Sequence, residues 1–185
     1  MELIAKLVEL LPVQTGTNKK GKWKKQDFIV ETHEPNKRTV CLSCWDDSIR
    51  MNEFKKDEIL KINFRIETKE YNHKWNTYVT AFRAERSVNE VQKEISFTSK
   101  IETIMPERTK ILEAGTSPKK FEEIFHRELF LVRDVNSGKL ILLNGRHLLP
   151  KEKGIKIGDI LIFSVHIQSE LNYGWKTRVF IDEVK

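Results

Sequence analysis

Cysteines and long apolar runs are both scarce in this sequence. Its 185 residues include two cysteines, Cys41 and Cys44, too few to staple a scaffold of this size, which favours a reducing compartment. No apolar run approaches the ~18 residues of a membrane span, so we expect no membrane partner. The N-terminus lacks the basic start and apolar stretch of a signal peptide, so we expect a cytoplasmic location.

Sequence signatures of catalysis are also missing. There is no P-loop, no dinucleotide-binding glycine motif and no nucleophile elbow. The neighbouring acids Asp46-Asp47 and Glu122-Glu123 are explained as solvated surface charge, because a metal-dependent nuclease needs carboxylates from separate elements. The histidines are scattered, and the cysteine pair has no second pair with which to bind zinc. We therefore predict a protein that is not an enzyme and that has no cofactor and no metal ion.

Positive charge is concentrated in one short segment. The chain has 33 Lys+Arg against 27 Asp+Glu, a net charge of +6, which permits a polyanionic partner without requiring one. Glycine, threonine and asparagine precede a lysine run, which predicts a basic loop over residues 15–25. Lysines can neutralise phosphates while an aromatic ring stacks on a base. A solvated loop that only aids solubility is the alternative. The residues concerned are Lys19, Lys20, Lys22, Trp23, Lys24 and Lys25.

Short alternating segments in the first half predict strands. Leu60–Ile66 alternates apolar and polar residues, which is typical of a half-buried strand. Val40–Trp45 alternates too, so Cys41 and Cys44 should point to opposite faces and pack within a sheet. Five strands, with a loop or single helical turn (Asp46–Lys56) between the third and fourth, are the order of a small Greek-key OB barrel. The expected strands are Ile4–Leu11, Trp23–Val30, Val40–Trp45, Leu60–Ile66 and Trp75–Ala84.

The second half of the chain repeats the first. Lys55–Thr68 aligns without gaps on Lys156–Ser169, and Glu70–Val79 then aligns on Glu170–Val179. Both copies contain Asn-x-x-Trp-x-Thr-x-Val after a matched strand, which apolar alternation alone does not produce. We therefore predict an all-β protein of two tandem five-stranded OB-type barrels. The predicted divisions are a first domain at 1–86, a linker at 87–95 and a divergent second domain at 96–185.

The two copies differ between their first and second strands. In place of the lysine loop, the second copy has Ser117-Pro118, a good helix start. Phe121, Ile124 and Phe125 then follow at the spacing of an amphipathic helix. We predict an inserted helix over Lys119–Arg127, followed by a hairpin at 128–143. Acidic residues dilute the positive charge there, so nucleic-acid binding by the second copy stays open, and the three apolar residues are a candidate pairing surface.

Aromatic and basic residues also gather at the hairpin between the fourth and fifth strands. In an OB barrel, the loops between strands 1–2 and 4–5 flank a groove whose floor is strands 2 and 3. The lysine loop takes the first position and Tyr71–Trp75 the second, while Trp45 would face the groove from strand 3. Core packing of Trp45 and Trp75 is the alternative. The further candidates for nucleic-acid binding are Trp45, Arg65, Tyr71, His73, Lys74, Trp75 and Tyr78, with Tyr173, Trp175, Lys176 and Arg178 in the second copy.

Several segments of the first half carry a family resemblance. They are Met1–Leu3, Lys6-Leu7, Leu11-Pro12, Thr15–Thr17, Gly21–Gln26, Phe28–Glu31, Trp45 and Glu67–Trp75. Together they resemble a small bacterial family of uncharacterised domains of the single-stranded-DNA-binding-protein type. The resemblance covers residues 1–86, and the second half is similar more loosely, mainly over 155–184. The family usually has one such domain. The resemblance implies an OB fold and single-stranded nucleic-acid binding, and it implies no catalytic residues.

These observations predict a non-catalytic protein that binds single-stranded DNA by neutralising phosphates and stacking on bases. RNA stays open as a ligand, and so does pairing into a homo-oligomer. The alternative is an OB-fold assembly module that binds proteins and not nucleic acid, with the lysines serving solubility alone.

Overall fold

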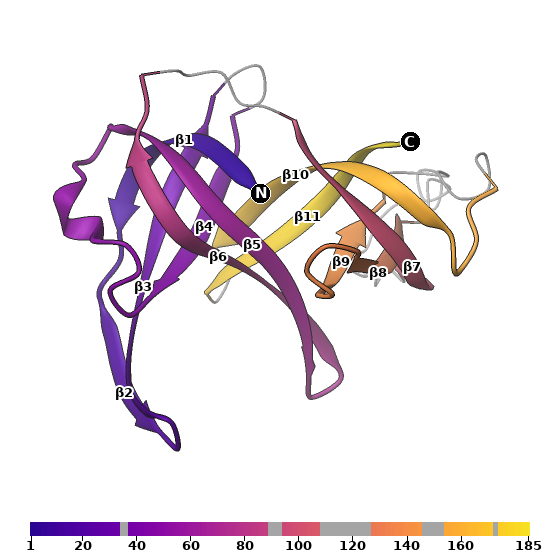
Figure 1. Cartoon of the computed structure of the whole chain (residues 1–185), viewed down its shortest axis with the longest axis horizontal. Coiled ribbons are helices and arrows are strands. Elements are labelled where there is room, and N and C mark those ends of the chain that lie inside the picture. Colours follow the sequence, from indigo (N-terminus) through magenta and orange to yellow (C-terminus); the bar gives the residue numbers. More distant parts are fainter. Residues whose placement is uncertain (34–36, 89–93, 108–126, 146–153, 172–173) are drawn as a thin grey trace, which may run out of the picture.

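The computed structural model describes residues 1–33, 37–88, 94–107, 127–145, 154–171 and 174–185. These residues form β-strands and one short 3-10 helix (Figure 1), so the predicted all-β class is confirmed. The helix predicted at Lys119–Arg127 lies outside the described residues, apart from Arg127, which begins a strand. Within the described ranges there is no apolar helix of a length that could span a membrane.

Five strands of the first half close into a ring, which we call the first ring. β1 (Glu2–Leu10) pairs with β3 (Gly21–Thr32), β3 with β4 (Thr39–Trp45), and β4 with β6 (Lys74–Arg86). β6 then pairs with β5 (Ile59–Tyr71), which returns to β1. All these pairs are antiparallel except β4–β6, which is parallel. A 3-10 helix, η1 (Met51–Glu53), joins β4 to β5, where the sequence predicts a loop or single helical turn.

A second ring follows with the same order of pairing. Its strands are β7 (Ile95–Glu107), β8 (Arg127–Asp134), β9 (Leu140–Asn144), β10 (Ile160–Leu171) and β11 (Trp175–Val184). β7 pairs with β8, β8 with β9, β9 with β11, β11 with β10, and β10 returns to β7. The pair β9–β11 is parallel, as β4–β6 is in the first ring. The hairpin predicted at 128–143 corresponds to β8 and β9.

Small details recur in the two rings. A bulge interrupts β1 between Leu7 and Glu9, and another interrupts β7 between Ile101 and Thr103. The backbone N–H of Leu7 donates to the carbonyl of Glu58 at 2.9 Å. The N–H of Ile101 donates to the carbonyl of Asp159 at the same distance. The aligned segments of the sequence therefore have the same local structure.

Residues 15–25 form a β-hairpin, so the predicted basic loop is wrong. β2 (Gln14–Asn18) pairs antiparallel with the start of β3, from Gln14 opposite Lys25 to Asn18 opposite Gly21. The turn is the dipeptide Lys19-Lys20, followed by Gly21 at φ 123°, a conformation that glycine adopts without strain. Because this ladder continues past the first ring, residues 14–25 extend beyond it as a two-stranded ribbon, which we call the ribbon (Figure 1).

The two cysteines confirm the predicted strand packing of β4. Leu42 and Cys44 point into the first ring, and Cys41 lies on the opposite face, as residues of odd spacing must in a strand. Both thiols are free and buried. Burial, with a smaller effect from the carboxylate of Asp27, raises the pKa of Cys41 to about 12.

The rings meet where the β5–β6 hairpin of the first ring crosses the β10–β11 hairpin of the second ring. β6 and β11 pair antiparallel at Thr77 and Thr177, which occupy equivalent positions in the two copies. The N–H of Cys41 donates to Ser169 Oγ at 2.9 Å. In the equivalent contact, the N–H of Leu142 donates to the hydroxyl of Thr68 at 2.9 Å. The two rings therefore exchange matched hydrogen bonds across a local two-fold axis.

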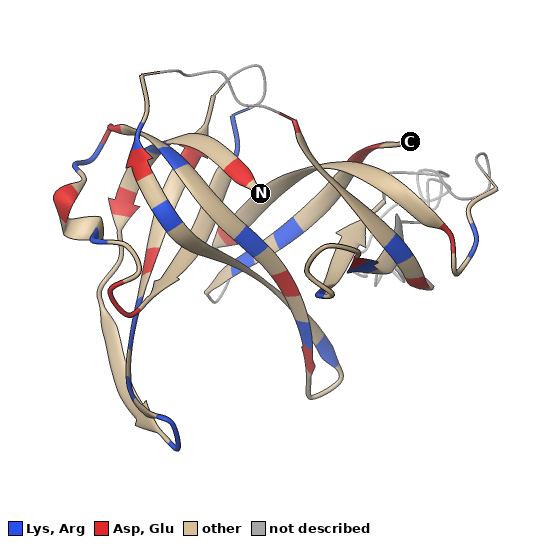
Figure 2. Cartoon of the chain, viewed as in Figure 1, with Lys and Arg blue, Asp and Glu red and all other residues tan. Residues whose placement is uncertain are grey.

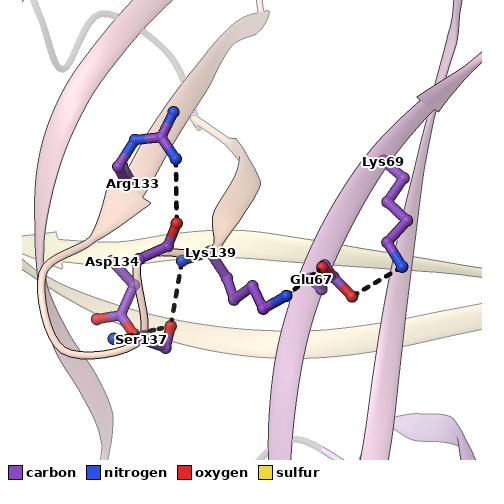
Figure 3. A network of polar contacts seen from close by, with 7 residues as sticks. Glu67, Lys69, Arg133, Asp134, Ser137 and Lys139 are labelled. Carbon is purple, nitrogen blue, oxygen red and sulfur yellow. Dashed lines mark hydrogen bonds and ion pairs between the residues drawn. The ribbon is translucent and has the colours of Figure 1, made fainter.

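Ion pairs add to this junction. Lys139 Nζ lies 2.8 Å from Glu67 Oε1, linking the β8–β9 turn to β5 (Figure 3). Lys69 Nζ contacts the other oxygen of the same carboxylate at 3.1 Å. Ser137 bonds to Asp134 in the turn that carries Lys139 (Figure 3). The carboxylate of Glu67 is therefore held by one lysine from each ring.

Candidate nucleic-acid interface

Two tryptophans meet at the base of the β2–β3 hairpin. Trp23 comes from β3 and Trp45 from the end of β4, where Trp45 pairs with Lys25. Their ring centroids are 5.9 Å apart and their planes are inclined by 60°, a favourable aromatic geometry. Trp45 is 42% exposed, so it lies outside the core as predicted. The pair therefore lies partly exposed beside the lysines of the hairpin.

Gly16 makes the position of Trp23 possible. Gly16 lies opposite Trp23 in the β2–β3 ladder, and the indole covers its Cα. A Cβ added at position 16 would lie 2.4 Å from Trp23 Cζ2, inside the ring system. An aromatic ring laid over a cross-strand glycine compensates for the side chain that glycine lacks. The sequence pattern indicates a turn at Gly16, and its contact with Trp23 emerges only from the strand register.

The lysines of the ribbon differ in whether they form ion pairs with acidic side chains. Figure 2 shows positive charge at the tip of the hairpin. In the described part of the chain, Lys19, Lys20 and Lys22 make no ion pair. Lys24 Nζ lies 3.2 Å from Asp47, and Lys25 Nζ lies 2.9 Å from Asp27. The three lysines nearest the tip are therefore the ones free to meet a phosphate.

Strand geometry also divides these lysines between two faces. Trp23 and Lys25 lie on one face of the ribbon, and Lys22 and Lys24 lie on the other, because side chains alternate along a strand. Lys25 is therefore on the same face as Trp23, and Lys22 is on the face that points away from it. The predicted set of five lysines is therefore not one flat surface.

An acid sits within the candidate site. Asp27 accepts hydrogen bonds from Lys25 at 2.9 Å and from Ser43 Oγ at 2.6 Å. Both charged side chains are largely buried, 24% exposed for Lys25 and 16% for Asp27. The carboxylate compensates the charge of Lys25 and would repel a phosphate placed there. No sequence pattern marks Asp27 as a member of the site.

The turn after β4 fixes Trp45 beside the ribbon. Asp46 adopts a left-handed conformation at φ 52°, which aspartate tolerates better than most residues. Its N–H donates to the carbonyl of Lys24 at 2.7 Å, and its carboxylate accepts the N–H of Lys24 at 3.1 Å. This two-way contact ties the end of β4 to β3. Asp46 is therefore structural, whereas Asp47 is an exposed surface charge paired with Lys24.

The tip of the β5–β6 hairpin forms a separate arm. Tyr71 is 71% exposed, and His73 and Lys74 are exposed as well. Figure 1 shows this tip well apart from the tip of the β2–β3 hairpin, with both extending from the same side of the first ring. The residues predicted at this hairpin thus do not join the tryptophan pair. They would meet a ligand as a second contact region.

The remaining predicted residues are dispersed over the strands. Trp75 is half-buried near the start of β6, and Tyr78 is 48% exposed further along it. Arg65 is exposed on β5, opposite Thr80 of β6. On β11, Trp175 and Arg178 are half-buried and Lys176 is exposed, whereas Tyr173 lies outside the described residues. In the described ranges, no group of three histidine, cysteine or acidic side chains could hold a metal ion.

Comparison with known proteins identifies the fold. A family described as a domain of unknown function (DUF3127) matches residues 2–85, the extent of the first ring. Comparison with curated proteins gives no match. The wild-type single-stranded DNA binding protein from Thermus aquaticus superimposes with a TM-score of 0.58 at 12% identity, covering 100% of this chain and 90% of that chain. The chain has an OB-type fold. A deletion mutant of the same Thermus protein gives a TM-score of 0.57 at 13% identity, covering 100% and 91%.

Proposed function

We propose that this protein binds single-stranded DNA and catalyses no reaction. The observation that carries the proposal is the partly exposed pair Trp23 and Trp45 at the base of a lysine-tipped hairpin. Each base that stacks on an aromatic side chain contributes about 1–3 kcal/mol. The tip lysines would neutralise phosphates and make binding sensitive to salt. The shared OB-type fold with a protein whose name states single-stranded DNA binding supports this ligand class.

The second part of the proposal concerns the organisation of the chain. Each ring would be a complete OB-type barrel, and the two would derive from duplication of one ancestral domain. The matching strand order, bulges and turns of the rings support this. The domains would be residues 1–86 and 96–185, joined at 87–95, and the free cysteines suit the cytoplasmic location that the proposal assumes.

Ligand contacts would divide among three regions. The tryptophan pair would hold bases, with Lys25 close by. Lys19, Lys20 and Lys22 would meet phosphates along the ribbon. Lys24, which forms an ion pair with Asp47, would lie beside them. Residues at the tip of the β5–β6 hairpin and on its strands would contact longer ligands. The second ring would add further contacts if it binds nucleic acid. The proposed additional contacts are Arg65, Tyr71, His73, Lys74, Trp75 and Tyr78, with Tyr173, Trp175, Lys176 and Arg178 from the second ring.

A fluorescence titration tests the proposal. Labelled oligo-dT is titrated with the full chain at two salt concentrations, and Trp emission is followed in parallel. We expect binding that weakens with salt and quenches Trp emission. A Lys19→Ala/Lys20→Ala/Lys22→Ala triple variant should bind more weakly, and the slope of its salt dependence should be shallower by about 0.7 for each phosphate that it no longer neutralises. Oligo-U as competitor decides between DNA and RNA.

A charge-matched variant controls for net charge. Lys55, Lys56 and Lys156 are exposed and lie away from the ribbon, so replacing all three by alanine should leave binding unchanged. Equally weakened binding by both triple variants would show that DNA is attracted by the net charge of the protein and not by a site on the ribbon. No binding of wild-type protein to oligo-dT at low salt would overturn the proposal. The protein-binding assembly module would then be the remaining hypothesis.

A further inference from the structure

A third aromatic side chain lies outside the first ring, on β6. Phe82 is 50% exposed, while its neighbour Ala81 and the preceding Val79 are buried in the core. Alternation along the strand therefore directs Phe82 outward. A single exposed apolar side chain is common on protein surfaces, so the case for Phe82 depends on what lies around it.

The pairing of β4 with β6 places Phe82 on the same side of the sheet as Trp45. β4 and β6 run parallel, with Ser43 opposite Thr80. Trp45 and Phe82 each lie two residues further along, on the same outward face as Ser43 and Thr80. Neighbouring strands are about 4.8 Å apart. Trp23, Trp45 and Phe82 therefore lie on the outward faces of three successive strands, β3, β4 and β6, and we call these three residues the aromatic row.

A bulge in the β5–β6 ladder coincides with Phe82. Asn63 pairs with Arg83 and Phe64 pairs with Ala81, which leaves Phe82 as the unpaired extra residue. Bulges bend a strand and re-aim a side chain, and they are over-represented next to binding and active sites. The bulge therefore leaves Phe82 without a partner on β5, and the ladder resumes at Arg83 opposite Asn63.

Positive charge lies at both ends of the aromatic row. The lysine ribbon is at the Trp23 end. At the Phe82 end, Arg65 lies on β5 opposite Thr80, and it is exposed. Arg65 makes no ion pair within the described part of the chain. A polyanion that crosses the row is therefore met by cations where it enters and where it leaves.

We propose that Phe82 is a third base-stacking platform, so that single-stranded DNA crosses β3, β4 and β6 in turn toward Arg65. This inference rests on the proposed function. It adds the path of the DNA strand over the first ring and the smallest number of nucleotides that the ring contacts. Three platforms need at least three bases, close to the lower limit of about 4 nucleotides per OB fold. Stacking on a phenyl ring reads no base edge, so the added contact should be indifferent to sequence.

Two substitutions at Phe82 separate stacking from apolar packing. Phe82→Leu keeps an apolar side chain but removes the π-face, and it should weaken binding of an eight-nucleotide oligo-dT roughly 5- to 150-fold. Phe82→Tyr keeps the ring and should bind like wild type. Ile160→Ala, at an apolar position of the second ring that is 62% exposed, is the control and should change nothing.

The outcomes distinguish this inference from the function on which it rests. If the wild-type chain does not bind oligo-dT, the proposed function fails. If Trp45→Leu weakens binding but Phe82→Leu does not, the function stands and the third platform is overturned. A Phe82→Trp variant provides a second measurement, since oligo-dT should quench more of its Trp emission than in wild type. Quenching equal to that of wild type would also overturn the inference.

Discussion

At the scale of single residues, the candidate site depends on what fills the space above Gly16. The indole of Trp23 lies where a side chain at that position would be, and it leans on Trp45 at 5.9 Å. A methyl group placed 2.4 Å from the indole cannot be accommodated unless the ring moves. Since the ring is held by this contact on one side and by Trp45 on the other, moving it separates the pair.

Gly16→Ala should therefore displace Trp23. We expect loss of the near-UV signal of the coupled indoles and of the about 0.5–1.5 kcal/mol that such an aromatic pair contributes beyond burial. Circular dichroism and urea denaturation measure the two effects. Thr17→Ala, on the opposite face of the same strand, is the control. Identical near-UV spectra for Gly16→Ala and wild type would contradict this account of the hairpin.

Asp27 offers a second test at the residue scale. Its carboxylate holds Lys25 at 2.9 Å, so Asp27→Asn should free one lysine beside the tryptophan pair while the Ser43 contact is kept. We expect tighter binding of oligo-dT and a salt dependence steeper by about 0.7, the effect of neutralising one more phosphate. Titration at several salt concentrations measures the slope. Weaker binding by a folded Asp27→Asn variant would show that the carboxylate itself contacts the ligand.

At the scale of elements, the crossed hairpins join the rings through hydroxyl groups. Ser169 on β10 accepts the N–H of Cys41 on β4 and contacts Thr177 at 2.7 Å. Ser169 and Cys41 are both buried. The N–H of Cys41 therefore has this hydroxyl as its acceptor, in a place that is buried from solvent.

Ser169→Ala should destabilise the protein by about 1–3 kcal/mol, the cost of a buried donor left without an acceptor. Urea denaturation of the full chain measures the change. Ser96→Ala removes the same group from an exposed position on β7 and should fall within about 0.5 kcal/mol of wild type. Equal stabilities of the two variants would mean that the junction does not depend on this hydrogen bond.

Several elements could be predicted from the sequence because apolar alternation reports burial directly. β4, β5 and the hairpin of β8 and β9 lie where that pattern predicts, and Trp45 lies outward because it is out of phase with Leu42 and Cys44. The β2–β3 ribbon differs from the predicted loop because its residues are polar on both faces and carry no burial signal. Phe82 continues the outward phase of Tyr78 and Thr80, whereas the bulge at Phe82, which shifts the phase from Arg83 onward, could not be predicted from alternation. The crossing of the hairpins depends on contacts distant in sequence, which periodicity does not encode.

At the scale of the whole molecule, the buried thiol of Cys41 links stability to alkaline pH. In the unfolded chain the thiol loses its proton near its ordinary pKa of 9.0, whereas in the folded chain it keeps the proton up to about 12. Between these values the unfolded state binds fewer protons, so stability falls as pH rises. Lysines titrate in the same range, which makes a comparison with a variant necessary.

Cys41→Ala should therefore lose less stability than wild type between about pH 9 and pH 11. Urea denaturation of both proteins at several pH values gives the two slopes, and the difference between them belongs to the thiol. Alkylation supplies an independent measurement, since both buried thiols should react slowly in the folded protein at pH 8. Parallel pH profiles for the two proteins would assign the alkaline loss to other groups.

The antiparallel pairing of Thr77 with Thr177 has a consequence for strand polarity. Equivalent strands that run in opposite directions relate the two rings by a local two-fold axis. If both rings bind single-stranded DNA as proposed, a strand that crosses the first ring from 5′ to 3′ would meet the second ring in the opposite sense. A strand that turns back on itself, or two strands that run in opposite directions, would then satisfy both rings.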